Sequence, residues 1–137
     1  MSPRREVAQV APGDALPPVH HEIQRPDLVK YAGASGDFNP IHWNEEWATS
    51  VGLPGVIAHG MFSMGVAARM VSAYAGDPAA IKRLRVRFSA MIRPGQTLTV
   101  RGEVAAVEGK QVSLRFWGED EAGNRVLSKG EAELELA

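Results

Sequence analysis

The segment from His59 to about Ala75 constrains the fold more than any other part of this chain. It has the length of an ordinary helix, and apolar side chains would cover most of the surface of that helix. These residues are Met61, Phe62, Met64, Val66, Ala67, Ala68, Met70, Val71, Ala73 and Tyr74. A helix that is apolar on nearly all sides must be buried on most of them, so the rest of the chain has to enclose it.

After Gly76-Asp77-Pro78 the sequence changes to an alternation of apolar and polar residues, which is typical of strands with one buried face. The alternation predicts four strands, within 84–92, 98–106, 112–116 and 126–136. Turn residues separate them at Pro94-Gly95, at Glu108-Gly109-Lys110 and within 120–124. The expected arrangement is an antiparallel meander, whose apolar face needs a cover.

Helix 59–75 is the simplest cover, because it belongs to the same chain and must itself be enclosed. The predicted fold class is therefore α+β, a single hotdog fold in which an antiparallel β-sheet wraps around a long central α-helix. An exposed sheet edge invites pairing, so we expect a dimer with a continuous sheet. With 137 residues the chain suits one domain, which we place over 1–137.

The N-terminal part of the chain predicts smaller elements. Residues 1–18 lack sustained periodicity and indicate an irregular arm, on which Arg4 and Arg5 would be mobile. A first strand is expected from Val19 to Ile23.

A helix is expected next, with Pro26 in its first turn and its end near Gly36. Residues 35–42 form a predicted loop around Asn39-Pro40, because the proline keeps the preceding residue out of helical geometry. Asn44 is the expected N-cap of a short helix that follows.

Composition narrows the function classes. A formal net charge of −1 disfavours nucleic-acid binding through bulk positive charge, and the absence of cysteine excludes disulfides and thiolate chemistry. The most apolar stretch, 61–75, is interrupted by Ser63, Arg69 and Ser72, which disfavours a membrane span. Residues 1–11 lack the apolar core of a signal peptide, so a cytoplasmic location is expected.

Two side chains with acid/base chemistry flank the proline bend. Asp37 and His42 lie five residues apart, and such a carboxylate and imidazole could both reach one small ligand, such as a water molecule. On its own Asp37 would more often be a turn residue. With Asn39, Pro40 and His42 beside it, a catalytic pair is the favoured interpretation.

The start of the central helix adds a second element, Ala58-His59-Gly60-Met61. The first N–H groups of a helix lack internal partners and lie at its positive end, and Gly60 has no side chain to block approach. This position suits a carbonyl oxygen that gains negative charge during a reaction. For His59 we favour a structural role, in which it caps the helix or fixes the loop.

The run Gly36-Asp37-Phe38-Asn39-Pro40-Ile41-His42, followed by Ala58-His59-Gly60-Met61, resembles the hydratase-2 signature of MaoC-like hotdog enzymes. The stretches Tyr31-Ala-Gly, Pro40-Ile-His-Trp43 and Ile57-Ala-His-Gly-Met61 look especially like the HadB-type subunit of mycobacterial R-specific 3-hydroxyacyl-ACP dehydratases.

The resemblance implies a hydro-lyase that interconverts trans-2-enoyl and R-3-hydroxyacyl thioesters of CoA or acyl carrier protein. Asp37 and His42 would be the catalytic dyad, and the Gly60 N–H would polarise the thioester carbonyl. Asn39 would support the loop, and His59 would lie beside the substrate. The reaction would need no cofactor and no metal, and the chain would act as a homodimer or as a heterodimer with a related hotdog subunit.

Two alternatives to this function stay open. The chain could need a different subunit to bind long substrates, or it could be a hotdog acyl-CoA thioesterase, since the fold is shared. A metal site of Asp37, His42 and His59 matches no familiar zinc spacing. For Arg83, Arg85, Arg87 and Arg93 we favour a solvated strand face over a docking patch for CoA phosphates or an acidic carrier protein.

Overall fold

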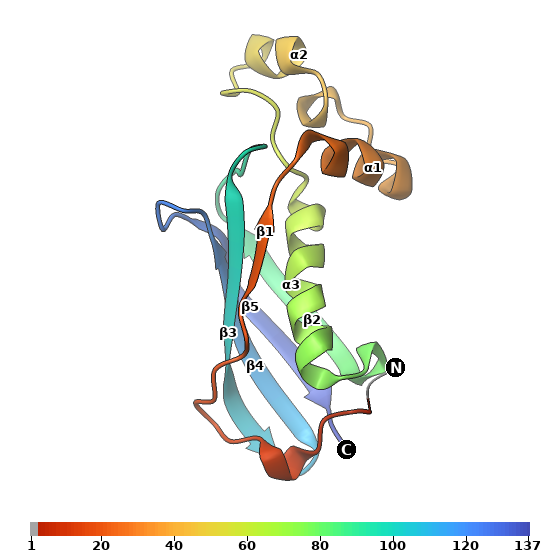
Figure 1. Ribbon diagram of the computed structural model, residues 1–137, viewed down its shortest axis with the longest axis vertical. Coiled ribbons are helices and arrows are strands. Elements are labelled where there is room, and N and C mark those ends of the chain that lie inside the picture. Colours follow the sequence, from red (N-terminus) through yellow and green to blue (C-terminus); the bar gives the residue numbers. More distant parts are fainter. Residues whose placement is uncertain (1–2) are drawn as a thin grey trace.

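The computed structural model describes residues 3–137 and contains one five-stranded antiparallel sheet with a long helix on one face (Figure 1). The strands are β1 (Val19–Glu22), β2 (Ile81–Phe88), β3 (Thr97–Glu108), β4 (Gln111–Glu119) and β5 (Arg125–Glu135). The helix, α3 (Gly60–Ala75), begins and ends close to the predicted residues. The predicted antiparallel sheet and central helix are therefore confirmed.

The predicted meander is wrong in one connection. The order of strands is β1-β3-β4-β5-β2, so β2 pairs with β5 and lies at the opposite side of the sheet from β3. Residues 89–96 are not a hairpin turn but cross the end of the sheet, and the chain is tied there by the Ala58 N–H, which donates to the Ile92 carbonyl at 2.8 Å. The strand expected to reach residue 92 accordingly ends at Phe88.

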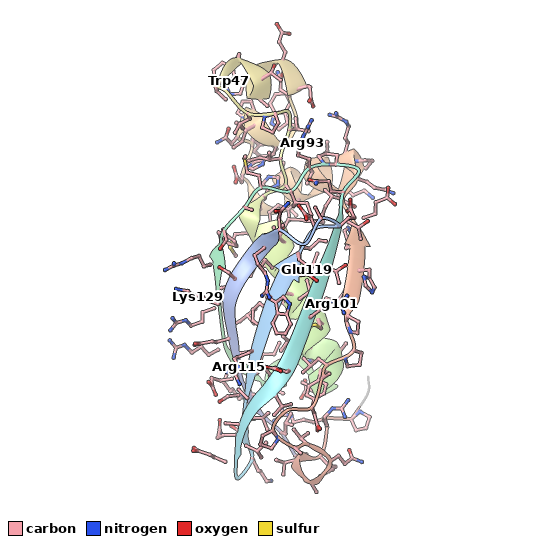
Figure 2. The ribbon with its side chains drawn as sticks, turned by 90° about the vertical axis from the view of Figure 1, so that its left-hand side faces the viewer. Trp47, Arg93, Arg101, Arg115, Glu119 and Lys129 are labelled. Carbon is pink, nitrogen blue, oxygen red and sulfur yellow. The ribbon has the colours of Figure 1, made fainter. Side chains whose placement is uncertain are left out.

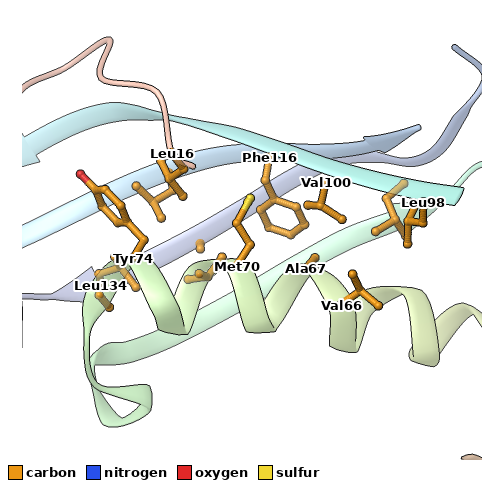
Figure 3. Packing of buried hydrophobic residues seen from close by; sticks show 14 of the residues in the cluster. Leu16, Val66, Ala67, Met70, Tyr74, Leu98, Val100, Phe116 and Leu134 are labelled. Atoms are coloured by element: carbon orange, nitrogen blue, oxygen red, sulfur yellow. The ribbon is translucent and has the colours of Figure 1, made fainter. Parts of the chain in front are cut away.

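The core lies between α3 and the concave side of the sheet (Figure 3). Met70 of α3 and Phe116 of β4 face each other near its middle, each at most 2% exposed. Val100 and Leu134 extend the same apolar layer along the sheet, and both are fully buried. The sheet curves around α3 and so buries many of the apolar side chains of this helix.

Three short helices project beyond the sheet at the end where α3 begins (Figure 1). They are α1 (Arg25–Ser35), η2 (Pro40–His42) and α2 (Glu45–Ser50). Asp27 and the N-cap Gln24 close a capping box at the start of α1, and Asn44 accepts the Trp47 N–H, which confirms the predicted N-cap of α2. These helices hold residues 36–42 near the first turn of α3.

The N-terminal arm is irregular except for one short turn, η1 (Val7–Gln9), but it is docked rather than mobile. Arg4 forms an ion pair with Asp77 at 2.8 Å. The Arg5 guanidinium donates to the Tyr74 carbonyl at 2.7 Å and lies 4.2 Å from the centre of the Tyr74 ring. The expectation of a free arm was wrong because these two arginines satisfy carbonyl and carboxylate groups at the far end of α3.

Within residues 3–137, no helix has the length and apolar character needed to cross a membrane.

Candidate active site

The loop that carries Asp37 begins where α1 ends. Gly36 adopts a left-handed conformation at φ 77°, which ends the helix and turns the chain toward α3. The Asp37 Oδ1 accepts the Asn39 N–H at 3.2 Å, and the Asn39 Oδ1 accepts the Ile41 N–H at 3.3 Å. Two successive side-chain-to-backbone turns therefore hold the loop in shape, and Asn39 contributes the second of them.

His42 is buried below this loop with a defined proton position. Its Nδ1 lies 2.7 Å from the Ile57 carbonyl oxygen, which can only accept a hydrogen bond, so Nδ1 carries the proton in the neutral ring. Its Nε2 then presents a lone pair, and this atom lies 3.7 Å from Oδ2 of Asp37. The backbone of Ile57 thus orients the imidazole so that Nε2 faces the Asp37 carboxylate.

Asp37 differs from His42 in its access to solvent. The side chain of Asp37 is 53% exposed, whereas that of His42 is 8% exposed. The 3.7 Å between carboxylate and imidazole exceeds a direct hydrogen bond. A small hydroxyl-bearing ligand can therefore contact both groups from the open side, which is the arrangement expected of a shared acid/base pair.

His59 fixes the loop and does not cap the helix. It occupies the N-cap position of α3, but its side chain makes no capping hydrogen bond. Its Nε2 lies 3.2 Å from the Asp37 carbonyl oxygen, and its ring stacks on that of His42 with centroids 3.7 Å apart and an angle of 21°. Tyr31 packs edge-on against the other side at 4.7 Å, a contact that the periodicity of α1 gave no reason to expect.

Burial lowers the pKa of His59, the contact with the Asp37 carbonyl opposes this shift, and a charge on His42 adds to it. We therefore expect the free energy of unfolding to decrease as the pH falls below 6.5, because the unfolded histidine binds a proton there more readily than the folded one, whose pKa is lower. Urea unfolding at about pH 7.5 and about pH 5.5 measures this loss. The variant His59→Gln should show a smaller loss, and an equal loss in both proteins would contradict the assignment.

Gly60 begins α3 at the base of an open pocket. The N–H groups of Phe62 and Ser63 both donate to the His59 carbonyl, and the Gly60 N–H lies one turn too early to have a partner within the helix. A Cβ atom added at Gly60 would lie 2.9 to 3.0 Å from the Phe88 ring, so no side chain fits there without movement. The pocket has a volume of about 340 Å³ and is lined by Ile57, Ala58, Gly60, Phe88, Ser89, Ala90 and Met91.

Phe88 and Met91 were missed as pocket residues. Alternation placed Phe88 on the buried face of a strand, yet its side chain is 50% exposed, and that of Met91 is 51% exposed. The strand ends at Phe88 and the chain leaves the sheet, and no signal in the sequence marks that departure. The pocket adjoins His42 through Ile57, whose carbonyl holds the imidazole.

The three groups Asp37, His42 and His59 offer ligand atoms that lie within 4.8 Å of one another. A zinc ion would need nitrogen atoms at ~2.0–2.1 Å whose lone pairs converge on it. The rings of His42 and His59 are stacked and nearly parallel, so their in-plane lone pairs do not converge on one point. The geometry therefore suits proton transfer better than metal binding.

Comparison with known proteins identifies the family of this chain. A family model described as "MaoC like domain" matches residues 7–119. A fatty acid synthase beta subunit of Emericella nidulans is 33% identical over 118 residues, which cover 83% of this chain and 6% of that protein. The peroxisomal enoyl-CoA hydratase 2 of Arabidopsis thaliana is 39% identical over 82 residues, which cover 58% of this chain and 26% of that protein.

Solved structures agree with this result. A MaoC-like dehydratase superposes with a TM-score of 0.93 at 34% identity, covering 99% of this chain and 43% of the other. The unliganded R-hydratase PhaJ1 from Pseudomonas aeruginosa gives a TM-score of 0.89 at 27% identity and covers 97% of this chain and 86% of that one. This chain spans only a small part of the length of the fatty acid synthase subunits. The family model, however, matches most of this chain. The chain therefore belongs to the MaoC-like domain family.

Proposed function

We propose that this chain is a hydro-lyase that interconverts trans-2-enoyl and R-3-hydroxyacyl thioesters. The observation that carries the proposal is the pairing of Asp37 with His42, in which the Ile57 carbonyl leaves Nε2 of the imidazole free to face the carboxylate. The similarity to an R-hydratase and to an enoyl-CoA hydratase 2 supports this reaction class and this stereochemistry.

In the proposed hydration, a water molecule contacts both Asp37 and His42. The water oxygen bonds to C3 of the enoyl group while the pair takes one proton from that water, and the C2–C3 π electrons shift toward the thioester carbonyl. The pair then returns a proton to C2. Dehydration is the reverse of these steps, so the thioester gains or loses one water molecule and no other reactant takes part.

The Gly60 N–H would stabilise the enolate-like oxygen that forms between these steps. It lies at the positive end of α3, which has sixteen residues and is apolar around most of its surface. Asn39 keeps the loop in shape, and His59 holds the Asp37 backbone through its carbonyl. No cofactor is needed, because every proton that moves is supplied by water or by the pair.

A second hotdog chain is proposed to complete the site. Large apolar residues at this end of the molecule that are at least half exposed include Phe38, Met61, Phe88 and Met91. Strand β2 forms one edge of the sheet directly beside the pocket. A homodimer or a HadB-type heterodimer would cover this surface and form the wall of an acyl tunnel, with the thioester carried by CoA or by acyl carrier protein.

Loss of the enoyl-thioester absorbance with crotonyl-CoA tests the activity, and chiral analysis of the product tests the R configuration. Release of free thiol without hydration would indicate a thioesterase instead. Native mass measurement of the purified protein distinguishes a homodimer from a chain that needs a different partner. Absence of both hydration and thiol release from a stable dimer, with CoA and carrier-protein substrates alike, would contradict the proposal.

A further inference from the structure

A second hollow lies on the outer face of the sheet, on the side away from α3. It has a volume of about 330 Å³ and is lined by Arg85, Arg115, Phe116, Trp117, Arg125, Lys129, Gly130 and Glu131. Because neighbouring residues of a strand point to opposite faces, Arg115 and Trp117 face outward while Phe116 lies in the core. Figure 2 shows Arg115 and Lys129 on this open face.

The hollow carries an excess of positive charge. Two of its cations have carboxylate partners: Arg85 lies 3.5 Å from Glu131, and Arg115 lies 3.5 Å from Glu103. Among residues 3–137 no ion pair involves Arg125 or Lys129. These two side chains are therefore available to an anion, and the two paired arginines add to the positive potential around it.

The backbone of Lys129 has a positive φ angle, which a regular strand with a solvated face does not need. Lys129 has a φ of 52° and is the only non-glycine residue with positive φ among those that the structure describes. It lies in a β-bulge, where the pairing of β4 with β5 shifts between Phe116 and Gly118. Glycine would suit this conformation better than lysine, so a lysine here indicates that its side chain has a use.

The neighbouring glycine makes the bulge possible. A Cβ atom at Gly130 would meet the carbonyl oxygen and the ring of Phe116, so β5 can approach β4 this closely only without a side chain at that position. The close approach pairs Gly130 with Phe116 and leaves Lys129 in the bulge that follows, where its side chain and that of Trp117 both line the hollow. The cationic side chain thus projects from a fixed point of the sheet and not from a free loop.

Trp117 gives the hollow an aromatic wall. The Arg125 guanidinium lies over this ring at 5.0 Å from its centroid. Indole and guanidinium planes both stack on planar bases, and guanidinium and ammonium groups bind phosphate oxygens. We propose that the hollow binds a nucleoside phosphate, with the base stacked on the Arg125 guanidinium where it lies over Trp117, and with the phosphates bound by Lys129, Arg85 and Arg115.

This site is separate from the dyad and does not depend on the proposed function. The test is therefore a binding measurement with adenosine 3′,5′-bisphosphate, which has no thioester and cannot be turned over. Calorimetry of the full chain at low salt should detect binding that weakens as salt is added. Inorganic pyrophosphate, which has the charge but no base, should bind at least several-fold more weakly.

Single substitutions locate the site. Lys129→Gln and Arg125→Gln should each weaken the nucleotide about tenfold, because each removes a charge-assisted contact. Arg101→Gln is the matched control, since Arg101 lies on the same outer face beside Glu119 but outside the hollow. Lys129→Gly should weaken binding without lowering the melting temperature, because glycine accepts the positive φ.

Equal binding by all of these variants would overturn the proposal, as would an Arg101→Gln variant as weak as Lys129→Gln. Pyrophosphate that binds as tightly as the nucleotide would overturn the role of Trp117, and with it the nucleoside. The combination expected from the structure is weaker binding in the two hollow variants and in Lys129→Gly, with normal binding in Arg101→Gln.

Discussion

Replacing Asp37 by asparagine is expected to lower kcat/KM for hydration of crotonyl-CoA by at least about a hundredfold, because general acid/base catalysis contributes ~10²–10⁴ to a rate. Asparagine has nearly the same shape, and its Oδ1 can still accept the Asn39 N–H that holds the loop. The substitution therefore removes proton transfer and leaves the local structure in place. The initial rate of absorbance loss at saturating and limiting substrate measures the effect.

The control for this prediction is another exposed carboxylate. Glu103→Gln changes a side chain that is 42% exposed and faces Arg115 on the outer side of the sheet. It should retain the wild-type rate. A rate for Asp37→Asn close to that of Glu103→Gln would show that the carboxylate does not take part in the reaction.

His42→Ala should also abolish turnover, but the structure makes it the less informative variant. His42 is 7% exposed, and its Nδ1–H donates to the Ile57 carbonyl. Its removal leaves that carbonyl without a partner at a cost of ~1–3 kcal/mol. Reduced activity in His42→Ala therefore needs a parallel measurement of unfolding, whereas Asp37→Asn does not.

Replacing Phe116 by alanine is expected to lower the free energy of unfolding by about 3–5 kcal/mol, the largest stability effect that a single core residue offers here. Phe116 is 2% exposed, and its ring lies between β4 and Met70 of α3 (Figure 3). Truncation leaves a cavity at the centre of the layer, and the strands on both sides are held by their backbone pairing with β3 and β5. Urea unfolding followed by circular dichroism gives the value.

Phe88→Ala is the matched control for this measurement. It removes the same atoms from a side chain that is 50% exposed at the end of β2. Measured at a protein concentration low enough to keep the chain monomeric, its effect on unfolding should stay within about 1 kcal/mol, because the ring is only half buried within one chain. An equal loss of unfolding free energy in both phenylalanine variants would contradict the greater contribution expected from the buried Phe116 ring.

The elements around the loop that carries Asp37 and His42 were predictable because each follows from a local rule. Pro40 excludes helix at Asn39, Gly36 ends α1 in the left-handed conformation, and Asn44 caps α2. These preferences act over a few residues and need no tertiary information. The proximity of Asp37 to His42 follows from the same short loop.

The contacts of His59 could not be predicted in this way. Spacing placed it at the start of α3, but the stacking on His42 and the hydrogen bond to the Asp37 carbonyl join segments that lie 17 and 22 residues apart in the sequence. Whether His59 would cap the helix or hold the loop depended on the path that residues 43–58 take between them. Only the packed structure determines that path.

The sequence by itself determined the antiparallel strands, the buried helix α3 and the loop with Asp37 and His42, because periodicity and turn residues encode local geometry. Tertiary structure decided that β2 pairs with β5, that Phe88 lines a pocket and that the N-terminal arm is docked. The alternation of apolar and polar residues in a strand does not determine at which edge of the sheet that strand pairs. The choice between edges depends on how residues 89–96 cross the end of the sheet, where the Ile92 carbonyl meets the Ala58 N–H, and on the burial that this crossing permits.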